Sequence, residues 1–539
     1  MKKILFAFLI LFIFHAPCKA QKVFNILDYG AIANGKSVNT DAINNTISEC
    51  NKSGGGIVYV PAGTFISGTI HLLSNVDFHL ESGATIKGSD NIMDFEKNGI
   101  IYGLFYTEDQ ENIGISGKGV IDGNGSFYHH ADKPHGIIEG EGTDSRNSFT
   151  RQGSNFMDFK GNNEDGPIAY TSRPHICLFF SHCTRVSLTD FLLIDSPSWS
   201  MRLNECEDVI ADRITMRNNM LIPNSDGIHC TSSRNVRISN CDLQCGDDGI
   251  IVSGYSDYFF FDNNKIEQGK KYTFGNTTGL SENFVVSNCI LSSRSAGIRV
   301  GYGYQDIRHC YFSNIIIFNS NRGILINARD KGSIEDIRFE NISIETRFHT
   351  GHWWGKAEPI HISAIPESLE NNKKGTIKNV RFKGININAE TGIVIWGEQE
   401  NDISNITLED IAMHIRNGKY NNQLGGNLDL RPAYDVKRAI FEKDIAGLYA
   451  HNVNMLKIDG LEITHDDKLP MFYTYGIWIE NFNKLFIANS QLKSLDGKST
   501  DILLENGNGA RIMNTLDLFG DKLNLSCKDV INLKTGIGR

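Results

Sequence analysis

The stretch NVRISNCDLQC, residues 235–245, joins two short strands rich in alternating apolar residues through a polar residue, Asn240. The stretch IRFENISIET, residues 337–346, repeats this pattern around Asn341. Most intervals between successive central residues are 22–29 residues or about twice that length. A repeat of short strands at this spacing is typical of a solenoid in which each turn stacks on the last. The central residues are Asp190, Asp212, Asn240, Asn288, Asn314, Asn341, Gly384, Asp410, Gly460 and Asn489.

This repeat predicts an all-β fold, a single-stranded parallel β-helix with turns about 4.8 Å apart. A β-propeller needs blades of about 40–45 residues built from hairpins, and the intervals do not fit that alternative. Helical periodicity appears near the N-terminus, where Asn39 or Thr40 precedes Ile43 and Ile47 on one helical face. We expect this helix to cap the solenoid, because the open strand edge at its end needs a cover.

Residues 1–20 carry two lysines, an apolar run from Ile4 to Phe14 and a small-residue cleavage site, which predicts a signal peptide. A lipoprotein anchor at Cys18 is the weaker alternative. We expect residues 21–539 to form one secreted or periplasmic β-helix catalytic domain. Without residues 1–20 the chain holds 50 basic and 63 acidic residues and no basic block, which argues against nucleic acid and anionic membranes as partners. No other stretch approaches 18 apolar residues, so no membrane insertion is predicted.

Ten cysteines follow residue 20, too few for a disulfide scaffold, and we expect most of them to be buried thiols, with one or two bridges left open. Cys241 and Cys245 lack a second pair at zinc spacing, so no metal or cofactor is predicted. The polar stretch 126–172 has no periodicity and predicts a long loop excursion. It fits a disordered surface loop and a lid or subsite wall equally well.

Two glycine turns carry the candidate chemistry. IPNSDGIHC, residues 222–230, contains Asp226, and CGDDGI, residues 245–250, contains Asp247 and Asp248. Twenty-one residues is about one turn of the solenoid, so we expect the three carboxyl groups to share one cleft. Mutual repulsion keeps a proton on such a cluster. A proton donor beside carboxylate bases is what inverting glycoside hydrolysis uses. Each turn alone is commonplace, and a calcium cluster is the alternative.

The sequence resembles glycoside hydrolase family 28, the polygalacturonase family. The similarity rests on FNILDYGAIANGKSVNTDAI (residues 24–43), GKGVIDGNG (117–125), PNSDGIH (223–229) and GDDGI (246–250). The resemblance implies a right-handed parallel β-helix that hydrolyses O-glycosidic bonds in pectin-type polysaccharide with inversion. It implies Asp247 as the general acid, with Asp226 and Asp248 holding and deprotonating the attacking water.

Two family motifs are altered. Ala296 stands where a Gly-His-Gly histidine is expected, and Leu325 and Asn327 stand where the cations of an Arg-Ile-Lys motif are expected. In the family these cations grip a uronic acid carboxylate. Either the substrate has a neutral sugar at this subsite, or a shifted arginine supplies the charge. The candidate arginines are Arg299, Arg322 and Arg329.

Further candidates for contact with a polysaccharide or oligosaccharide substrate are Asn224, His229, Trp353 and Trp354. The two tryptophans can stack on sugar faces or pack under a loop. His229 can orient a carboxylate or cap a turn. Two other functions stay open, a polysaccharide lyase and a non-catalytic carbohydrate-binding β-helix. The sequence leaves the oligomeric state open.

Overall fold

The structure is a computed structural model that describes residues 22–134, 149–153, 167–169, 173–222, 224–254, 257–261, 271–276, 279–351, 353–366 and 374–536. The predicted signal peptide, residues 1–20, lies outside the described residues. Among the described residues, no helix has the length and apolar character that a membrane crossing requires.

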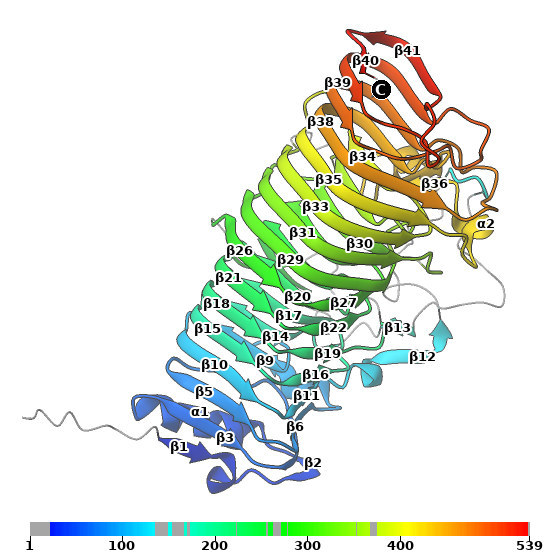
Figure 1. Cartoon of the computed structure of the whole chain (residues 1–539). Coiled ribbons are helices and arrows are strands. Elements are labelled where there is room, and N and C mark those ends of the chain that lie inside the picture. The colour runs from blue at the N-terminus through cyan, green and yellow to red at the C-terminus, as the bar shows by residue number, and fades with distance from the viewer. Residues whose placement is uncertain are drawn as a thin grey trace, which may run out of the picture.

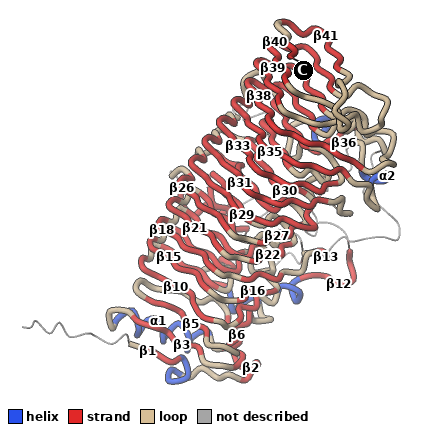
Figure 2. Tube along the Cα trace, in the orientation of Figure 1, coloured by secondary structure: helices blue, strands red, loops and turns tan. Residues whose placement is uncertain are grey.

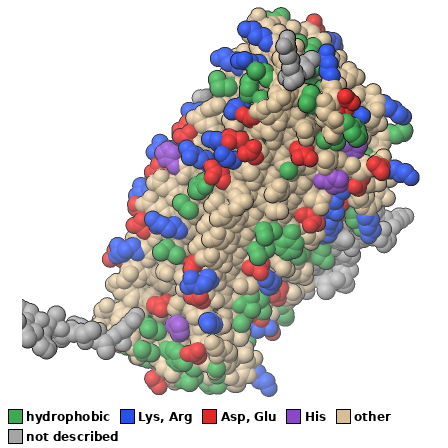
Figure 3. Space-filling view, in the orientation of Figure 1, with side chains coloured by type: hydrophobic (Ala, Val, Ile, Leu, Met, Phe, Trp, Pro, Cys, Tyr) green, Lys and Arg blue, Asp and Glu red, His purple; other side chains and the backbone are tan. Residues whose placement is uncertain are grey.

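The chain winds into a right-handed parallel β-helix, as predicted. Among the described residues, thirty-four strands belong to one continuous sheet, in which strands of successive turns pair in parallel. The stack runs from β1 at the N-terminal end to β40 and β41 at the C-terminal end (Figure 1), and strands dominate along its whole length (Figure 2). On the face seen in this orientation, charged side chains of both signs are interspersed (Figure 3).

The strands lie on three faces, of which the first begins at β9 and the other two begin at β1 and β2. The first, the site face, contains β9 (Phe105–Glu108), β14 (Ile176–Ser181), β17 (Trp199–Asn204), β20 (Ile228–Thr231), β23 (Ile250–Gly254), β28 (Ala296–Gly303), β30 (Arg322–Ala328), β32 (Ile360–Ala364) and β34 (Ile393–Gly397). It continues into the first parts of β38 (Leu448–His465), β39 (Ile477–Ala488) and β40 (Ile502–Met513).

The second face contains β1 (Val23–Asn25), β3 (Gly56–Val60), β5 (Val76–Leu80), β10 (Glu111–Gly117), β15 (Thr184–Thr189), β18 (Glu207–Asp212), β21 (Arg234–Ser239) and β26 (Ser281–Ser287). The third contains β2 (Asn34–Val38), β4 (Gly63–Ser67), β6 (Ala84–Gly88), β11 (Val120–Asp122), β16 (Leu192–Ile194), β19 (Thr215–Arg217), β22 (Asp242–Cys245) and β27 (Ile290–Ser293). Four long strands span both the second and the third face: β29 (Ile307–Ser320), β31 (Ile334–Thr346), β33 (Ile377–Ala389) and β35 (Ile403–Ile415).

Shorter elements lie at the ends of the stack or beside it. Strands β41 (Leu525–Ile531) and β42 (Lys534–Gly536) close its C-terminal end. Four antiparallel pairs are β7 (Glu96–Lys97) with β8 (Ile100–Ile101), β12 (His129–Pro134) with β13 (Pro167–Ala169), β24 (Asp257–Phe261) with β25 (Lys271–Asn276), and β36 (Asn427–Asp429) with β37 (Ile440–Glu442). The helices are α1 (Thr40–Lys52), α2 (Asn421–Leu424) and α3 (Val436–Ala439), with 3₁₀ turns at Ile26–Tyr29, Ile92–Phe95 and Gly125–Tyr128.

The polar centre of each repeat is a tight corner between the second and third faces. Nine of the ten predicted centres have positive φ, a conformation that Asn, Asp and Gly tolerate better than other residues. The exception is Asp212, because the corner falls one residue later, at Arg213, with φ 53°. Asparagines at successive corners also bond to one another, as in Asn341 Nδ2 donating to Asn314 Oδ1 at 2.7 Å. Corner chemistry therefore sets the register of the repeat.

Side chains that point inward form the core. In β31 and β33 buried and more exposed residues alternate, as expected for strands with one face toward the core. Phe312, Phe339 and Phe382 stack on three successive turns with ring centroids 4.8 Å apart. Nine of the ten cysteines in the described residues are buried free thiols, and the tenth, Cys527, is exposed and free.

Helix α1 lies at the N-terminal end of the stack, as predicted (Figure 1). Its buried residues, Ile43, Thr46, Ile47 and Cys50, face the core. Asn39 is at the N-cap position, but its side chain makes no capping bond. Its Oδ1 instead accepts a hydrogen bond from the Ile32 backbone at 2.6 Å, which ties the preceding loop to the helix.

The described parts of the 126–172 stretch pack in two places. Strands β12 and β13 pair with each other beside the early turns. Residues 149–153 instead contact the segment around β36 and β37, nearly 300 positions later, where Arg151 forms ion pairs with Glu442 and Asp444. The Phe149 backbone also donates to the Ile440 carbonyl at 3.0 Å. This stretch therefore connects an early part of the stack with a late one.

Candidate active site

The two turns that carry the three aspartates lie on adjacent rungs of the site face. Asp226 directly precedes the turn into β20, and Asp247 and Asp248 precede β23, which pairs with β20 in parallel. A backbone hydrogen bond from Gly227 to the Asp248 carbonyl, 2.8 Å long, joins the two turns. The three carboxyl groups therefore occupy one location, although Asp226 and Asp247 are 21 positions apart.

The glycines after the aspartates are required by how closely these turns stack. A side chain at Gly227 would place its Cβ 2.2 Å from the Gly249 carbonyl oxygen. A side chain at Gly249 would place its Cβ 2.6 Å from the carbonyl oxygen of Gly297 on the next rung. Both distances are too short for any Cβ, so glycine allows the Asp-Gly turns to lie directly on top of one another.

Asp248 is fully buried and both of its carboxylate oxygens have a donor. Arg299 Nη1, from β28 on the next rung, lies 2.7 Å from Asp248 Oδ2. The backbone N–H of Ala296 donates to Asp248 Oδ1 at 2.9 Å. These contacts hold the Asp248 carboxylate in one orientation and supply a compensating positive charge.

Asp226 is buried without such a partner. Its Oδ1 has no hydrogen-bond partner in the described part of the chain, and its Oδ2 lies 3.7 Å from His229 Nδ1. Burial, followed by the charges of Asp247 and Asp248, raises the pKa of Asp226 well above its ordinary value. Asp226 therefore favours the protonated form more strongly than an exposed aspartate does.

His229 is completely buried beside Asp226. Its Nε2 lies 2.8 Å from Ser253 Oγ, and its ring stacks on Trp199 with centroids 4.6 Å apart. Burial, with the charges of Arg299 and Arg202, lowers its pKa well below the ordinary value, so the imidazole is neutral. The structure thus places His229 as a packed neighbour of the carboxyl groups, without exposed surface toward a substrate.

Asp247 is the one carboxyl of the three that keeps some exposure to solvent. Burial and then repulsion from Asp248 raise its pKa from 3.8 to about 7. Its Oδ1 accepts the backbone N–H of Asp248 at 3.0 Å, and Ser293 Oγ donates to its carbonyl at 2.7 Å. Asn224, in the facing turn, is partly exposed and has φ 57°. The cluster thus presents a protonatable carboxyl at its solvent side.

Trp353 packs against the turn that contains Asp247. Its indole Nε1 donates to the Gly246 carbonyl, and the Arg294 guanidinium lies over its ring, 4.6 Å from the centroid. Trp353 and Trp354 are both partly exposed. The structure therefore brings Trp353 to the aspartates from more than 100 positions away.

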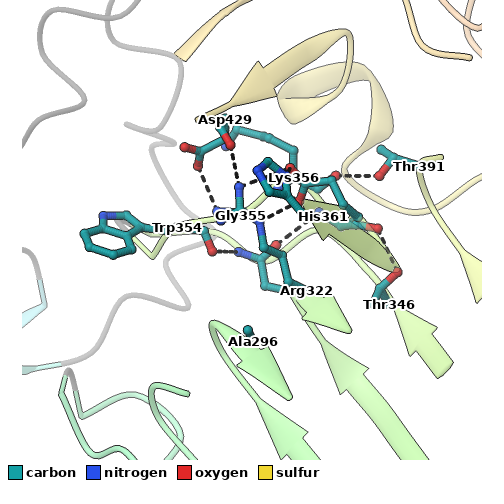
Figure 4. A network of polar contacts seen from close by, with 12 residues as sticks. Ala296, Arg322, Thr346, Trp354, Gly355, Lys356, His361, Thr391 and Asp429 are labelled. Carbon is teal, nitrogen blue, oxygen red and sulfur yellow. Dashed lines mark hydrogen bonds and ion pairs between the residues drawn. The ribbon is translucent and has the colours of Figure 1, made fainter. Parts of the chain in front are cut away.

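A buried ion pair holds residues 353–355, here called the tryptophan segment, in place. Arg431 Nη2 lies 2.8 Å from Asp429 Oδ2 and donates to the Trp353 carbonyl at 2.9 Å. Asp429 Oδ2 also accepts the Gly355 backbone N–H at 2.8 Å. In Figure 4 Asp429 lies over Gly355, while the Trp354 ring projects away from the network. Asp429 and Arg431 belong to no motif in the sequence, and sequence reasoning missed them.

Arg322 differs from the expectation that it contacts substrate. Its side chain is completely buried, and its guanidinium pairs with Glu358 through Nε at 3.1 Å and Nη2 at 3.2 Å. Nη2 also donates to the Asp429 carbonyl. Arg322 therefore lies within the support beneath the tryptophan segment, on the rung above Ala296 (Figure 4). No sugar can reach it directly in this arrangement.

Glu358 and His361 complete this support. Glu358 Oε1 lies 3.3 Å from His361 Nδ1, and His361 Nε2 lies 3.0 Å from Ser363 Oγ. Burial opposes ionisation of Glu358, but the charge of Arg322 and the hydrogen bonds from His361 and Arg322 together outweigh it and lower the pKa of Glu358 to about 2. Burial, with the charge of Arg322, lowers the pKa of His361 to about 4. The support is thus an Arg322–Glu358 ion pair beside a neutral histidine.

The positions of the altered family motifs are also buried. Arg329 is buried and donates to Ser363 and to the Leu430 carbonyl at 3.0–3.1 Å. Leu325 lies next to Arg299 across β28 and β30. Both amide atoms of the buried Asn327 lack a hydrogen-bond partner in the described part of the chain. Among the described residues, no group of three His, Cys, Asp or Glu side chains is arranged to hold a metal ion.

Carboxyl groups that meet on adjacent rungs are the groups that glycosidases use as acid and base. Comparison with known proteins places the chain within that class: it belongs to glycosyl hydrolases family 28, whose family model matches residues 50–330. The expected family resemblance is confirmed. The tryptophan segment and its Asp429–Arg431 support lie beyond the matched residues.

Two curated relatives are similar to this chain. A probable polygalacturonase of Vitis vinifera is 26% identical over 398 residues, which cover 70% of this chain and 74% of the relative. An exo-poly-α-D-galacturonosidase of Dickeya chrysanthemi is 26% identical over 264 residues, 42% of this chain and 41% of the relative.

Two solved structures share the fold. An exopolygalacturonase from Thermotoga maritima has a TM-score of 0.55 at 22% identity, covering 73% of this chain and 87% of that one. A family 28 exopolygalacturonase of Yersinia enterocolitica has a TM-score of 0.58 at 15% identity, covering 86% and 78%.

Proposed function

We propose that this protein is an exported glycosidase that hydrolyses O-glycosidic bonds in a pectin-type polysaccharide with inversion. The observation that carries the proposal is the asymmetric carboxyl cluster. Asp247 is partly exposed with a pKa of about 7, whereas Asp248 is buried against Arg299. One carboxyl able to hold a proton beside one held as an anion meets the requirement for an acid and a base in the same site.

In the proposed reaction Asp247 donates its proton to the glycosidic oxygen as the bond to the anomeric carbon breaks. A water held by Asp226 and Asp248 attacks that carbon from the opposite side and gives up a proton to the cluster. The bond to water forms as the bond to the leaving sugar breaks, so the configuration inverts. The cluster then releases the proton taken from the water to solvent, and Asp247 takes up a proton from solvent, so the acid and the base both return to their starting states.

The substrate class follows from the family and from the names of the relatives, which are polygalacturonases and a galacturonosidase. The arginines near the aspartates contact protein groups: Arg299 pairs with Asp248, and Arg322 pairs with Glu358. Arg294 lies against Trp353 and the Thr350 carbonyl. Because these arginines are engaged with protein groups, we favour a pectic substrate with a neutral sugar beside the cleaved bond, such as rhamnogalacturonan or a neutral side chain, over plain polygalacturonan.

The test is to incubate the protein with polygalacturonan, rhamnogalacturonan and neutral galactans, following reducing ends and the ultraviolet absorbance of unsaturated products. Asp247→Asn is the matched variant, because it removes the acid and keeps the size of the side chain. We expect reducing ends without absorbance and a loss of about 10²–10⁴-fold in the variant. Unsaturated products indicate a lyase. Binding without turnover in both proteins indicates a carbohydrate-binding β-helix.

A further inference from the structure

Arg299 has a geometry that its position in the sequence does not reveal. Its guanidinium lies one rung above Asp248 on the site face and approaches it to 2.7 Å, with both side chains at least nine-tenths buried. The second Asp248 oxygen is taken by the Ala296 N–H. Asp226, by contrast, has an oxygen with no hydrogen-bond partner among the described residues. The three carboxyl groups are therefore held in three different ways.

We propose that Arg299 is a positioning residue for the reaction: it fixes Asp248 as the anion that accepts the proton of the attacking water, and leaves the retained proton to Asp226 and Asp247. The inference rests on the proposed function and refines it, because it separates the roles of Asp226 and Asp248. Asp248 is the proton acceptor, while Asp226 holds the water.

The groups that face this pair come from four rungs. Asp226 and His229 lie on the rung of β20, and Asp247 shares the turn of Asp248. The charge of Arg322, from β30, also interacts with that of Asp248. Arg202, on β17, lies opposite His229 in the parallel strand register, and its charge lowers the pKa of His229. His229 is neutral, so Arg299 supplies the positive charge in direct contact with the carboxyl cluster.

This role excludes a second one. The Arg299 side chain is more than nine-tenths buried, which keeps its guanidinium from a uronic acid carboxylate, so Arg299 acts on the proton balance and not on substrate affinity. The two roles predict different kinetics. Loss of a substrate contact raises KM, whereas loss of the ion pair lowers kcat and moves the pH dependence of the reaction.

The sign of the pH shift follows from the charge. A positive charge favours the ionised form of every nearby carboxyl. The pKa of Asp247 is raised overall, but the charge of Arg299 opposes that rise. Removal of that charge makes the base harder to ionise, so the acidic limb of the pH–rate profile moves to higher pH. It also raises the pKa of the acid, which then keeps its proton to higher pH, so the alkaline limb moves in the same direction.

The experiment compares Arg299→Met, which removes the charge, with Arg299→Lys, which keeps it. The substrate is the panel polysaccharide that the unmodified protein cleaves, and kcat and KM are measured across pH. For the Met variant we expect kcat to fall about a hundredfold or more, both limbs to move up by about one pH unit, and KM to stay within about twofold. The Lys variant should retain the limbs of the unmodified protein.

Arg329→Met is the control, since it removes a buried guanidinium that contacts Ser363 and Leu430 and leaves the aspartates untouched. It should lose stability without moving either limb. If Arg299→Met behaves like this control, Arg299 is only structural and the inference is overturned. A higher KM on acidic polysaccharide with unmoved limbs also overturns it, in favour of substrate binding.

A readout independent of turnover separates failure of this inference from failure of the proposed function. The carboxyl titration of protein labelled with ¹³C-aspartate is followed by infrared absorption in the unmodified, Lys and Met forms. We expect carboxyl protonation to move to higher pH in the Met form alone, even if no panel polysaccharide is cleaved. Identical titrations in all three forms reject the role of Arg299.

Discussion

The indole Nε1 of Trp353 donates a hydrogen bond to the carbonyl oxygen of Gly246, the residue that directly precedes Asp247. The Trp353 carbonyl is in turn bound by Arg431, which pairs with Asp429. A chain of direct contacts thus runs from β36 and the loop after it to the turn of the proposed general acid. Trp353 has two separable features, a donor that holds the turn and a partly exposed ring.

Trp353→Phe removes the donor and keeps an aromatic ring. We expect kcat to fall about tenfold with little change in KM, because the turn of Asp247 loses a fixed contact. Trp353→Ala removes both features and should also raise KM several-fold if sugar stacks on the ring. Steady-state kinetics on the cleaved polysaccharide distinguish the two. Equal KM values for the Phe and Ala variants contradict a stacking role.

Asp247 should set the alkaline limb of activity. It must be protonated to act as an acid, and its pKa is about 7. We expect kcat/KM to fall as pH rises through about 7, by about tenfold for each further pH unit. The profile is measured in buffers of constant ionic strength. A flat profile between pH 6 and 9 shows that another group donates the proton.

Asp247→Asn should stabilise the protein while lowering turnover about 10²–10⁴-fold. A carboxyl whose folded pKa is raised costs stability above its unfolded value, and here the cost grows as pH rises from about 4 to about 7. The amide removes this cost, with an upper bound of about 4 kcal/mol at pH 8 and no gain at pH 3.

Asp248→Asn is the opposing control. It leaves Arg299 buried without its anion and should destabilise the protein by about 3–5 kcal/mol. Urea unfolding at both pH values measures the two variants. Destabilisation by Asp247→Asn at pH 8 contradicts the repulsive cluster.

The Arg322–Glu358 pair should make the protein sensitive to acid. The folded pKa of Glu358 is about 2, below its ordinary 4.5, so its contribution is present above pH 4.5 and is lost as pH falls toward 2. His361, with a folded pKa of about 4, binds a proton more readily when unfolded. It removes stability as pH falls from 6.5 to 4.

Glu358→Gln should cost about 3–5 kcal/mol at pH 7 and flatten the pH dependence below 4.5. Adding Arg322→Met should recover part of that loss, because no uncompensated buried charge remains. Chemical unfolding of the single and double variants tests this coupling. Additive losses show that the two side chains do not act as a pair.

The buried thiols predict indifference to reductant. Nine of the ten described cysteines are buried and free, so dithiothreitol should change the Tm by less than about 1 °C. Loss of a disulfide typically costs 2–5 kcal/mol, a far larger effect. In a chain that begins at Lys22, a thiol reagent should label Cys527 rapidly and the others only after unfolding. A second rapidly labelled thiol contradicts this arrangement.

Much of the fold is predictable because a solenoid is built from local rules. The spacing of Asn240, Asn288 and Asn314 gives the period, since each corner needs a residue that tolerates positive φ. At Asp212 the prediction is off by one residue: the left-handed corner position is occupied by Arg213. The adjacency of Asp226 and Asp247 follows from the same period.

The partners of the candidate residues were not predictable in the same way. Arg299 and Arg322 looked like equivalent replacements for missing cations, yet one pairs with Asp248 and the other with Glu358. Which acid each arginine meets depends on register and on the path of the segment that covers the site face. Neither leaves a periodic mark in the sequence.

The sequence by itself determined the parallel β-helix, its N-terminal cap and the meeting of three aspartates on adjacent rungs, because neighbouring turns in a solenoid are related by a fixed spacing. Only the tertiary structure decided that Trp353 rests on Gly246 and that Asp429 and Arg431 hold it there. These contacts join residues 74 to 107 positions apart, through loops whose lengths follow no repeat. Their geometry is set by how the loops pack on the finished stack.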